Sequence, residues 1–319
     1  MNFPVFDFHC DSAYRLLGSD WNQAGSLRKN DFHIDLERAK AFGGYAQCFA
    51  CFTTAPEEHV YEIPSVLLFE RELATIQREI DANQDLISLV YSPEEIEENR
   101  AAGKMSAILT LEGTAGINHD PELLEDLWAI GFRVSSLGWN EKNPLTGSNV
   151  TGGGLTDLGM DYVREAQRLG MRIDVSHISD EGFWDIMKIT QAPVIATHSN
   201  SRAVWNHSRN ITDEMIRAIC ETGGVAGYNT CAEFTGEKPT LDTICDHIFH
   251  FLELDPSGKH IALGGDLDGV DSMPEGFEGI QSYPALAQRL LDRGLSEDMV
   301  LDIYWNNAMR VMSGVRIGE

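Results

Sequence analysis

The chain has 319 residues and a formal net charge of −26 at pH 7, because 50 Asp and Glu outnumber 24 Lys and Arg. Apolar residues make up 43% of the sequence and charged residues 23%, which is typical of a globular protein with a sizeable core. Nucleic acids and anionic membranes bind proteins that have a basic surface. Because this chain is strongly acidic, we expect neither as a partner. No run approaches the ~20 apolar residues that span a bilayer. The first residues, MNFPVFDFHCD, lack the features of a secretory signal, so we expect a cytoplasmic protein with six reduced cysteines.

Short apolar runs recur along the chain and predict buried parallel strands, because several of them are apolar on both faces. The eight runs are Pro4–Asp11, Gly44–Thr53, Lys104–Gly113, Phe132–Asn140, Arg172–Ile178, Pro193–Asn200, Gly223–Asn229 and His260–Gly269. Helical patterns separate most of them, at Ile63–Asn83, Pro121–Ile130, Thr156–Leu169, Ser179–Thr190, Thr212–Thr222, Leu241–Leu254 and Ser296–Ser313.

The alternation of strand and helix predicts a parallel sheet with right-handed crossovers. Eight repeats in about 270 residues match a closed (β/α)8 TIM barrel. A doubly wound open sheet is the alternative, but the turn after the first run reads HCDSAYRLL and lacks the glycine-rich fingerprint of that fold. We therefore expect an α/β protein whose residues 1–319 form a single (β/α)8 barrel domain.

Residues that can hold metal ions stand at the ends of five predicted strands. Catalytic groups of such barrels gather at the carboxyl ends of the strands. His9 and Asp11 end the first strand and point the same way, because alternate strand residues share a face. Imidazole and carboxylate are ligands that Zn²⁺ and similar ions prefer. The sequence therefore predicts a metal site formed by His9, Asp11, Glu112, His177 and His198, with Asp266 beside it.

This donor set is larger than one catalytic ion needs, since such an ion usually takes three protein ligands and leaves a position open. A carboxylate shared by two ions resolves the count. Two divalent ions carry a charge of +4, which Asp11, Glu112 and a hydroxide reduce to +1. A free Asp266 carboxylate would neutralise this remaining charge. We therefore expect two Zn²⁺ ions per chain, with Asp266 as a general base next to them.

At this point the sequence resembles the renal, or membrane, dipeptidase family of zinc metallopeptidases, within the amidohydrolase superfamily. The resemblance extends over nearly the whole chain. The matching pieces are DFHCD at 7–11, LEG at 111–113, GLT at 154–156, DVSH at 174–177, THSNSRAV at 197–204, SRN at 208–210, GGDLDG at 264–269 and YWNN at 304–307.

The resemblance implies hydrolysis of dipeptides, often with a D-residue at the C-terminal position. In that family the residues matching His9 and Asp11 bind the first zinc, and the one matching Glu112 bridges both ions. Those matching His177 and His198 bind the second zinc. The residue matching Arg209 holds the substrate carboxylate, and the conserved acid falls on Asp266. Glu112 and Asp266 are thus the expected catalytic residues.

One position departs from the family pattern. Many members have Leu-Thr-His-Asn at the end of the fourth strand, where the His contacts the substrate carbonyl, but this chain has Leu-Gly-Trp-Asn at 137–140. The indole N–H of Trp139 can donate a hydrogen bond but cannot carry charge. We expect Trp139 either to donate to substrate or to shape the pocket, and Tyr228 to line the same pocket from the end of the seventh strand.

Two other functions remain open at this stage. One is a barrel hydrolase of lactones, cyclic amides or N-acyl amino acids. The other is a weakly active metal-binding barrel, with Trp139 marking lost activity. The resemblance also suggests a homodimer, because members of the family often form dimers.

Overall fold

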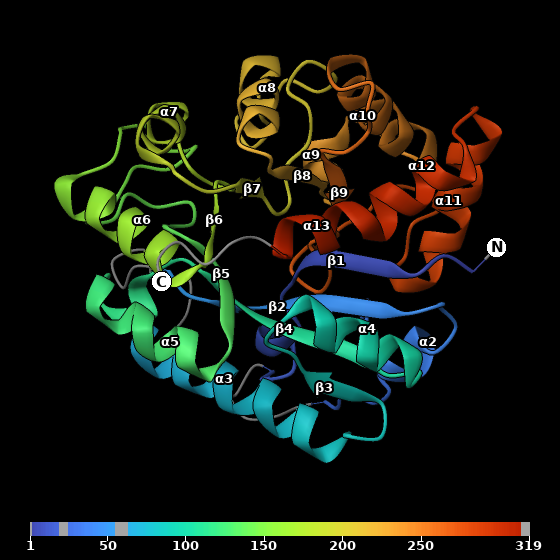
Figure 1. Ribbon diagram of the computed structural model, residues 1–319, viewed down its shortest axis with the longest axis horizontal. Coiled ribbons are helices and arrows are strands. Elements are labelled where there is room, and N and C mark those ends of the chain that lie inside the picture. Colours follow the sequence, from blue (N-terminus) through green and yellow to red (C-terminus); the bar gives the residue numbers. More distant parts are fainter. Residues whose placement is uncertain (1, 19–24, 55–62, 314–319) are drawn as a thin grey trace.

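Parallel strands form a closed barrel surrounded by helices in the computed structural model, which describes residues 2–18, 25–54 and 63–313 (Figure 1). The strands are β1 (Val5–Cys10), β2 (Tyr45–Phe52), β3 (Ile87–Leu89), β4 (Met105–Glu112), β5 (Phe132–Ser136), β6 (Arg172–Asp174), β7 (Val194–Ala196), β8 (Val225–Tyr228) and β9 (Ile261–Leu263). Neighbours follow the order β2-β1-β9-β8-β7-β6-β5-β4, and the parallel pairing of β2 with β4 closes the ring. The predicted (β/α)8 barrel is therefore confirmed.

Strand β3 lies outside this ring and was not predicted. It pairs with the start of β4, from Met105 to Ala107, whereas β5 pairs with the later part of β4, from Leu109 to Leu111. Its three residues are too few to give a periodic signal, and two of them are only half-buried. The barrel thus carries a short additional strand at the amino-terminal end of β4.

Helices cover the outside of the barrel. They are α1 (Ser12–Arg15), α2 (Leu36–Ala39), α3 (Ser65–Ala82), α4 (Pro93–Ala101), α5 (Leu124–Ile130), α6 (Asp157–Leu169), α7 (Asp180–Ile189), α8 (Asp213–Glu221), α9 (Ala232–Thr235), α10 (Leu241–Leu254), α11 (Tyr283–Asp292), α12 (Glu297–Leu301) and α13 (Asn307–Met312). Short turns of other helix types are η2 (Ala115–Ile117), η3 (Pro121–Leu123), η4 (Ile280–Ser282) and η5 (Asp302–Asn306), the last of them π-helical.

Side-chain caps fix where several of the predicted helices begin. The hydroxyls of Thr156, Ser179 and Thr212 each accept a hydrogen bond from a backbone N–H three residues further on. Such caps satisfy donors that the first helical turn leaves without a partner. The predicted helix Ser296–Ser313 runs without interruption from Glu297 to Met312, as α12, the π-helical turn η5 and α13.

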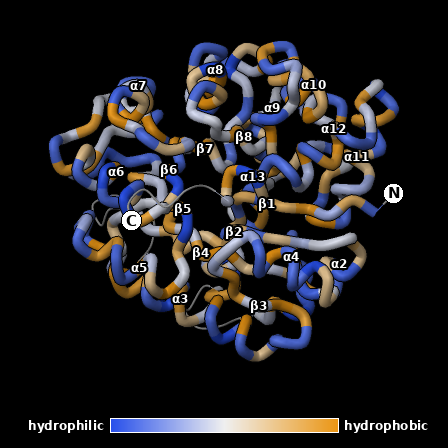
Figure 2. The backbone as a smooth tube through the Cα atoms, viewed as in Figure 1, coloured by the Kyte–Doolittle hydropathy of each residue, from blue (hydrophilic) through white to orange (hydrophobic). Residues whose placement is uncertain are grey.

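The barrel core consists of strand residues buried on both faces. Every residue of β1, β2 and β4 is buried. Figure 2 shows hydrophobic segments along the strands and a mixture of hydrophobic and hydrophilic residues on the outer helices. Within the described residues, no helix combines the length and the apolar character needed to cross a membrane. All six cysteines are free thiols.

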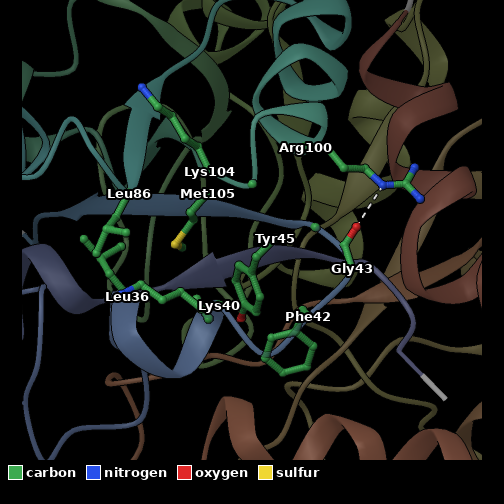
Figure 3. A pocket seen from close by; sticks show the side chains of 12 residues that line it. Leu36, Lys40, Phe42, Gly43, Tyr45, Leu86, Arg100, Lys104 and Met105 are labelled. Carbon is green, nitrogen blue, oxygen red and sulfur yellow. Dashed lines mark hydrogen bonds between the residues drawn. The ribbon is translucent and has the colours of Figure 1, made fainter.

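A cavity of about 250 Å³ lies at the amino-terminal ends of β2 and β4 (Figure 3). Tyr45, Met105 and Arg100 are among the residues that line it, and Arg100 donates from Nε to the Gly43 carbonyl at 3.0 Å. None of its lining residues is Asp, Glu, His or Cys. The predicted metal ligands therefore lie elsewhere, at the opposite ends of the strands.

Candidate active site

The carboxyl ends of the barrel strands bring together the residues that the sequence predicted as metal ligands. His9 is in β1, Asp11 follows it directly, and Glu112 is the last residue of β4. His9 Nε2 lies 3.3 Å from Asp11 Oδ2 and 3.4 Å from Glu112 Oε2. These three side chains are buried.

Glu112 stands between two groups of side chains. Its Oε2 faces His9, whereas its Oε1 lies 3.0 Å from His177 Nε2 and 3.5 Å from His198 Nε2. The Nε2 atoms of His177 and His198 are 3.2 Å apart. The two oxygens of Glu112 are thus directed to different sets of donors, which is the disposition that a carboxylate shared by two ions needs.

Hydrogen bonds fix the orientation of the two later histidines. His177 donates from Nδ1 to the side-chain oxygen of Asn140 at 2.9 Å. Thr197 donates its hydroxyl proton to Asp174 at 2.7 Å, so its oxygen is the acceptor for His198 Nδ1, also at 2.7 Å. Each ring then has its lone pair on Nε2, directed to Glu112. Supporting partners of this kind set the tautomer of metal-binding histidines.

Asp266 lies beside this cluster on the segment that follows β9. Asn229 donates from Nδ2 to Asp266 Oδ2 at 2.9 Å. The other oxygen, Oδ1, lies 4.0 Å from His9 Nε2. The carboxylate is therefore held at one oxygen and directed to the cluster with the other.

Two of these residues have a left-handed backbone conformation. His177 has a φ of 69° and Asp266 a φ of 54°. Such a conformation costs about 1–3 kcal/mol for a residue other than glycine and is concentrated at functional sites. Strands β6 and β9 end earlier than the sequence predicted, at Asp174 and Leu263, three residues before these positions.

The donor set fits divalent metal ions. His9 Nε2 and Asp11 Oδ1 are buried and have no hydrogen-bond partner among the described residues. Burial raises the pKa of the Glu112 carboxyl to about 7 and raises that of Asp266, so cations would offset a real desolvation cost. A Cβ on Gly269 would lie 2.0 Å from Asp11 Oδ2 and 2.7 Å from Asp266 Oδ1. Any larger residue at this position would therefore clash with the two carboxylates.

The imidazoles differ in charge. Burial lowers the pKa of His177 and His198 well below the ordinary value, so both are neutral, as metal ligation requires. Burial also opposes the charge on His9, but the carboxylates of Glu112 and Asp11 outweigh it and raise the pKa of His9 well above the ordinary value. A protonated His9 thus offsets the negative charge of these carboxylates. A bound metal ion would offset the same charge.

Arg209 is buried near the cluster and has donors without partners. It donates from Nη1 to Ser199 Oγ at 3.1 Å, and its guanidinium lies 5.8 Å from the centroid of the Phe234 ring. Its Nε and Nη2 atoms are buried and have no hydrogen-bond partner among the described residues. Two unpaired N–H donors on a planar guanidinium are suited to a carboxylate.

A pocket of about 430 Å³ opens over the cluster, lined by Asp11, Glu112, His177 and Asp266 among others. Trp139 and Phe52 form an aromatic wall, with ring centroids 5.0 Å apart in an edge-to-face arrangement. The Trp139 ring is 6.0 Å from that of His177. Trp139 is therefore placed where it can contact a bound substrate.

Tyr228 is not among the residues that line this pocket. Its side chain is buried, and its hydroxyl hydrogen-bonds to Thr235 Oγ1 at 2.9 Å. The next residue, Asn229, instead directs its side chain to Asp266. Successive residues at a strand end point to opposite sides, so a shift of one position exchanges a core residue for a site residue.

Two supporting residues had no predicted role, namely Asn140 and Asp174. Each stands beside or within a sequence piece that carries a predicted site residue. Their contacts join segments far apart in the chain, as between Asn140 and His177. Their closeness in sequence to the motifs was the only signal that they belong to the site. The residue to which each one hydrogen-bonds could not be predicted from the sequence.

Fold and site together define a barrel hydrolase of the metal-dependent type. The family model described as membrane dipeptidase, peptidase family M19, matches residues 1–317. The chain belongs to this family, whose members are hydrolases acting on dipeptides.

Curated relatives and solved structures agree with this assignment. The dipeptidase verJ of Clonostachys rogersoniana is 28% identical over 98% of this chain and 84% of its own length. An uncharacterised dipeptidase of Schizosaccharomyces pombe is 36% identical, but the match covers 65% of this chain and 52% of that protein. The structure of dipeptidase AC, a metallopeptidase of family M19, has a TM-score of 0.88 and 25% identity, with 98% of this chain and 100% of that chain covered. A metallopeptidase of Rhodobacter sphaeroides, 24% identical with a TM-score of 0.88 over 98% of this chain and 99% of that chain, shows the same fold.

Proposed function

We propose that this chain is a dipeptidase that uses two divalent metal ions, zinc in the first place. His9 and Asp11 would hold one ion, His177 and His198 the other, and Glu112 would bind both. The observation that supports this assignment most strongly is the disposition of Glu112, whose Oε2 faces His9 and whose Oε1 faces His177 and His198. A pair of such ions polarises a carbonyl and lowers the pKa of bound water towards ~7.

Asp266 is the proposed general base and acid. Its Oδ1 would accept the proton of the attacking water and pass it to the leaving amine. Asn229 holds Oδ2, so the carboxylate keeps one orientation during both transfers. The neighbouring His9 lies 4.0 Å away, close enough for Asp266 to act on groups bound at the cluster.

Arg209 is the proposed binding group for the C-terminal carboxylate of the substrate. Its unpaired Nε and Nη2 provide two parallel donors, and its burial strengthens a charge-assisted pair. Trp139 and Phe52, which line the pocket, would contact the substrate side chain or carbonyl. Trp139 is a neutral group, so polarisation of the carbonyl falls mainly to the cluster itself.

Hydrolysis of a panel of L,L and L,D dipeptides by the purified protein tests this function, with metal content measured on the same sample. The panel includes L-Ala-D-Ala, because the Rhodobacter sphaeroides structure holds a phosphinate mimic of that dipeptide. We expect hydrolysis of free dipeptides with about two ions per chain. Hydrolysis of lactones, cyclic amides or N-acyl amino acids in preference to every dipeptide would contradict the proposal.

A further inference from the structure

Three potential metal ligands meet at the amino-terminal end of the barrel, away from the catalytic cluster. Cys220 lies in the last turn of α8, Asp255 directly follows α10, and His260 directly precedes β9. A sulfur, a carboxylate oxygen and an imidazole nitrogen from these residues lie within 4.8 Å of one another. All three side chains are half-buried, so an ion can reach them from solvent.

We propose that Cys220, Asp255 and His260 form a second, separate site for a divalent ion of the zinc type. Thiolate, carboxylate and imidazole are the three ligand types of zinc in proteins. Zinc bonds of about 2.0–2.3 Å at tetrahedral angles place donor atoms about 3.4–3.6 Å apart, so the side chains need to close by about 1.4 Å at most. The thiolate and the carboxylate together carry the charge that balances a divalent cation, and a water completes the coordination.

The imidazole of His260 is already oriented for this role. It donates from Nδ1 to the Gly224 carbonyl at 2.7 Å, which leaves the lone pair on Nε2. A backbone carbonyl on the other ring nitrogen is a common support of a metal-binding histidine.

The carboxylate of Asp255 is also fixed and keeps a free acceptor position. Its Oδ1 accepts from the Ser257 N–H and hydroxyl, and its Oδ2 accepts from the His260 N–H at 3.2 Å. Two carboxylate oxygens offer about four lone-pair positions, so three accepted hydrogen bonds leave one for an ion. The ligand-bearing loop 255–260 is thus ordered by Asp255 itself.

Arg310 on α13 lies beside this site. Its guanidinium donates to the carbonyls of Gly223 and Lys259, at 2.6 and 2.7 Å, and so fixes the loops next to Cys220 and His260. Its positive charge favours the thiolate but opposes a cation nearby. We therefore expect this site to fill after the catalytic pair, which has three carboxylates around it.

Cobalt(II) distinguishes the two sites. None of the proposed catalytic ligands is a cysteine, so a thiolate-to-cobalt charge-transfer band in the near ultraviolet reports on Cys220. The full chain is titrated with Co²⁺ and followed by absorbance, and bound ions are counted. We expect the band to appear after the first two equivalents, and Cys220→Ser to abolish it and to bind one ion fewer, with dipeptide hydrolysis unchanged.

Cys231→Ser is the matched control, because Cys231 lines the catalytic pocket. This variant should keep the band. His260→Gln is the second test variant, in case Cys220→Ser fails to fold by circular dichroism, and it should lose the band while keeping the thiol. Absence of the band in the unaltered protein, its persistence in Cys220→Ser, or its loss in Cys231→Ser would each overturn the proposal. Glu112→Ala should keep the band, which separates this site from the proposed catalytic one.

Discussion

Asn229 donates its side-chain N–H to Asp266 Oδ2 at 2.9 Å and leaves Oδ1 directed to the metal-ligand cluster. The pair connects the end of β8 with the segment after β9, and it gives a buried carboxylate one defined orientation. A base or acid must lie within hydrogen-bond reach of the proton that it transfers, so this orientation matters for turnover.

The first prediction concerns the proton transfer. Asp266→Asn keeps the shape of the side chain but removes the base, so we expect kcat to fall about 10²- to 10⁴-fold. Metal content should stay at that of the unaltered protein, measured by elemental analysis. Asn229→Ala, which releases the carboxylate without removing it, should give a smaller fall. Turnover of Asp266→Asn at the unaltered rate would exclude this role.

The second prediction concerns the shared carboxylate. Glu112→Ala removes the two oxygens that face His9 and His177, so we expect bound metal to fall clearly below that of Asp266→Asn. Metal analysis after dialysis against the same buffer makes the comparison. Equal metal content in the two variants would mean that Glu112 does not hold the ions.

The third prediction concerns the substrate carboxylate. Arg209→Met removes two charge-assisted hydrogen bonds from a buried group, and we expect KM for a free dipeptide to rise by about 10- to 100-fold. The same dipeptide with an amidated C-terminus should be hydrolysed poorly by both proteins and to a similar extent. If the variant loses as much activity on the amide as on the free acid, Arg209 acts on something other than the carboxylate.

The fourth prediction concerns the glycine next to Asp11. A Cβ at position 269 would meet Asp11 Oδ2 at 2.0 Å and Asp266 Oδ1 at 2.7 Å, so Gly269→Ala must displace both carboxylates. We expect lower metal content and lower kcat together. Gly236→Ala is the control, because its Cβ would meet no atom closer than 3.4 Å and should change neither quantity.

The fifth prediction concerns acid stability. His33 accepts from the Asp268 N–H at its Nδ1, and burial, with Arg15 and Arg38 nearby, lowers its pKa to about 4. The unfolded chain binds a proton at this residue below pH 6.5 but the folded chain does so only near pH 4. The contribution of His33 to the free energy of unfolding should therefore fall as the pH is lowered from 6.5 to 4.

His33→Asn isolates this contribution, because asparagine offers an acceptor oxygen in place of Nδ1 but does not titrate. Denaturant unfolding of both proteins across this pH range gives the difference between them. The variant should lose less stability on acidification than the unaltered protein, and parallel curves would show that His33 does not contribute.

The sequence predicted the barrel because strand and helix patterns repeat with a regular alternation. It missed α11, although Tyr283, Leu286, Ala287 and Leu290 have helical spacing and are buried. It also missed the π-helical turn η5, where Ile303, Tyr304 and Trp305 are buried in succession. Three consecutive buried positions differ from the pattern of an amphipathic α-helix, and they accompany the π-helical turn between α12 and α13.

The candidate ligands could be predicted because ends of parallel strands meet at one edge. The backbone at those ends could not be predicted, since His177 and Asp266 adopt left-handed conformations that residues other than glycine rarely prefer. Tyr228 illustrates the limit, because its neighbour Asn229 has the contact with the site. Such a one-residue difference depends on where β8 ends, which local sequence patterns define poorly.

The proposed metal ligands and the proposed base together extend from His9 in β1 to Asp266 beyond β9, so they span most of the polypeptide. During biosynthesis, the ribosome must therefore synthesise most of the chain before these side chains can assemble around two metal ions. Premature termination anywhere before residue 266 would leave a product that lacks the proposed base, however many of the earlier ligands it had acquired.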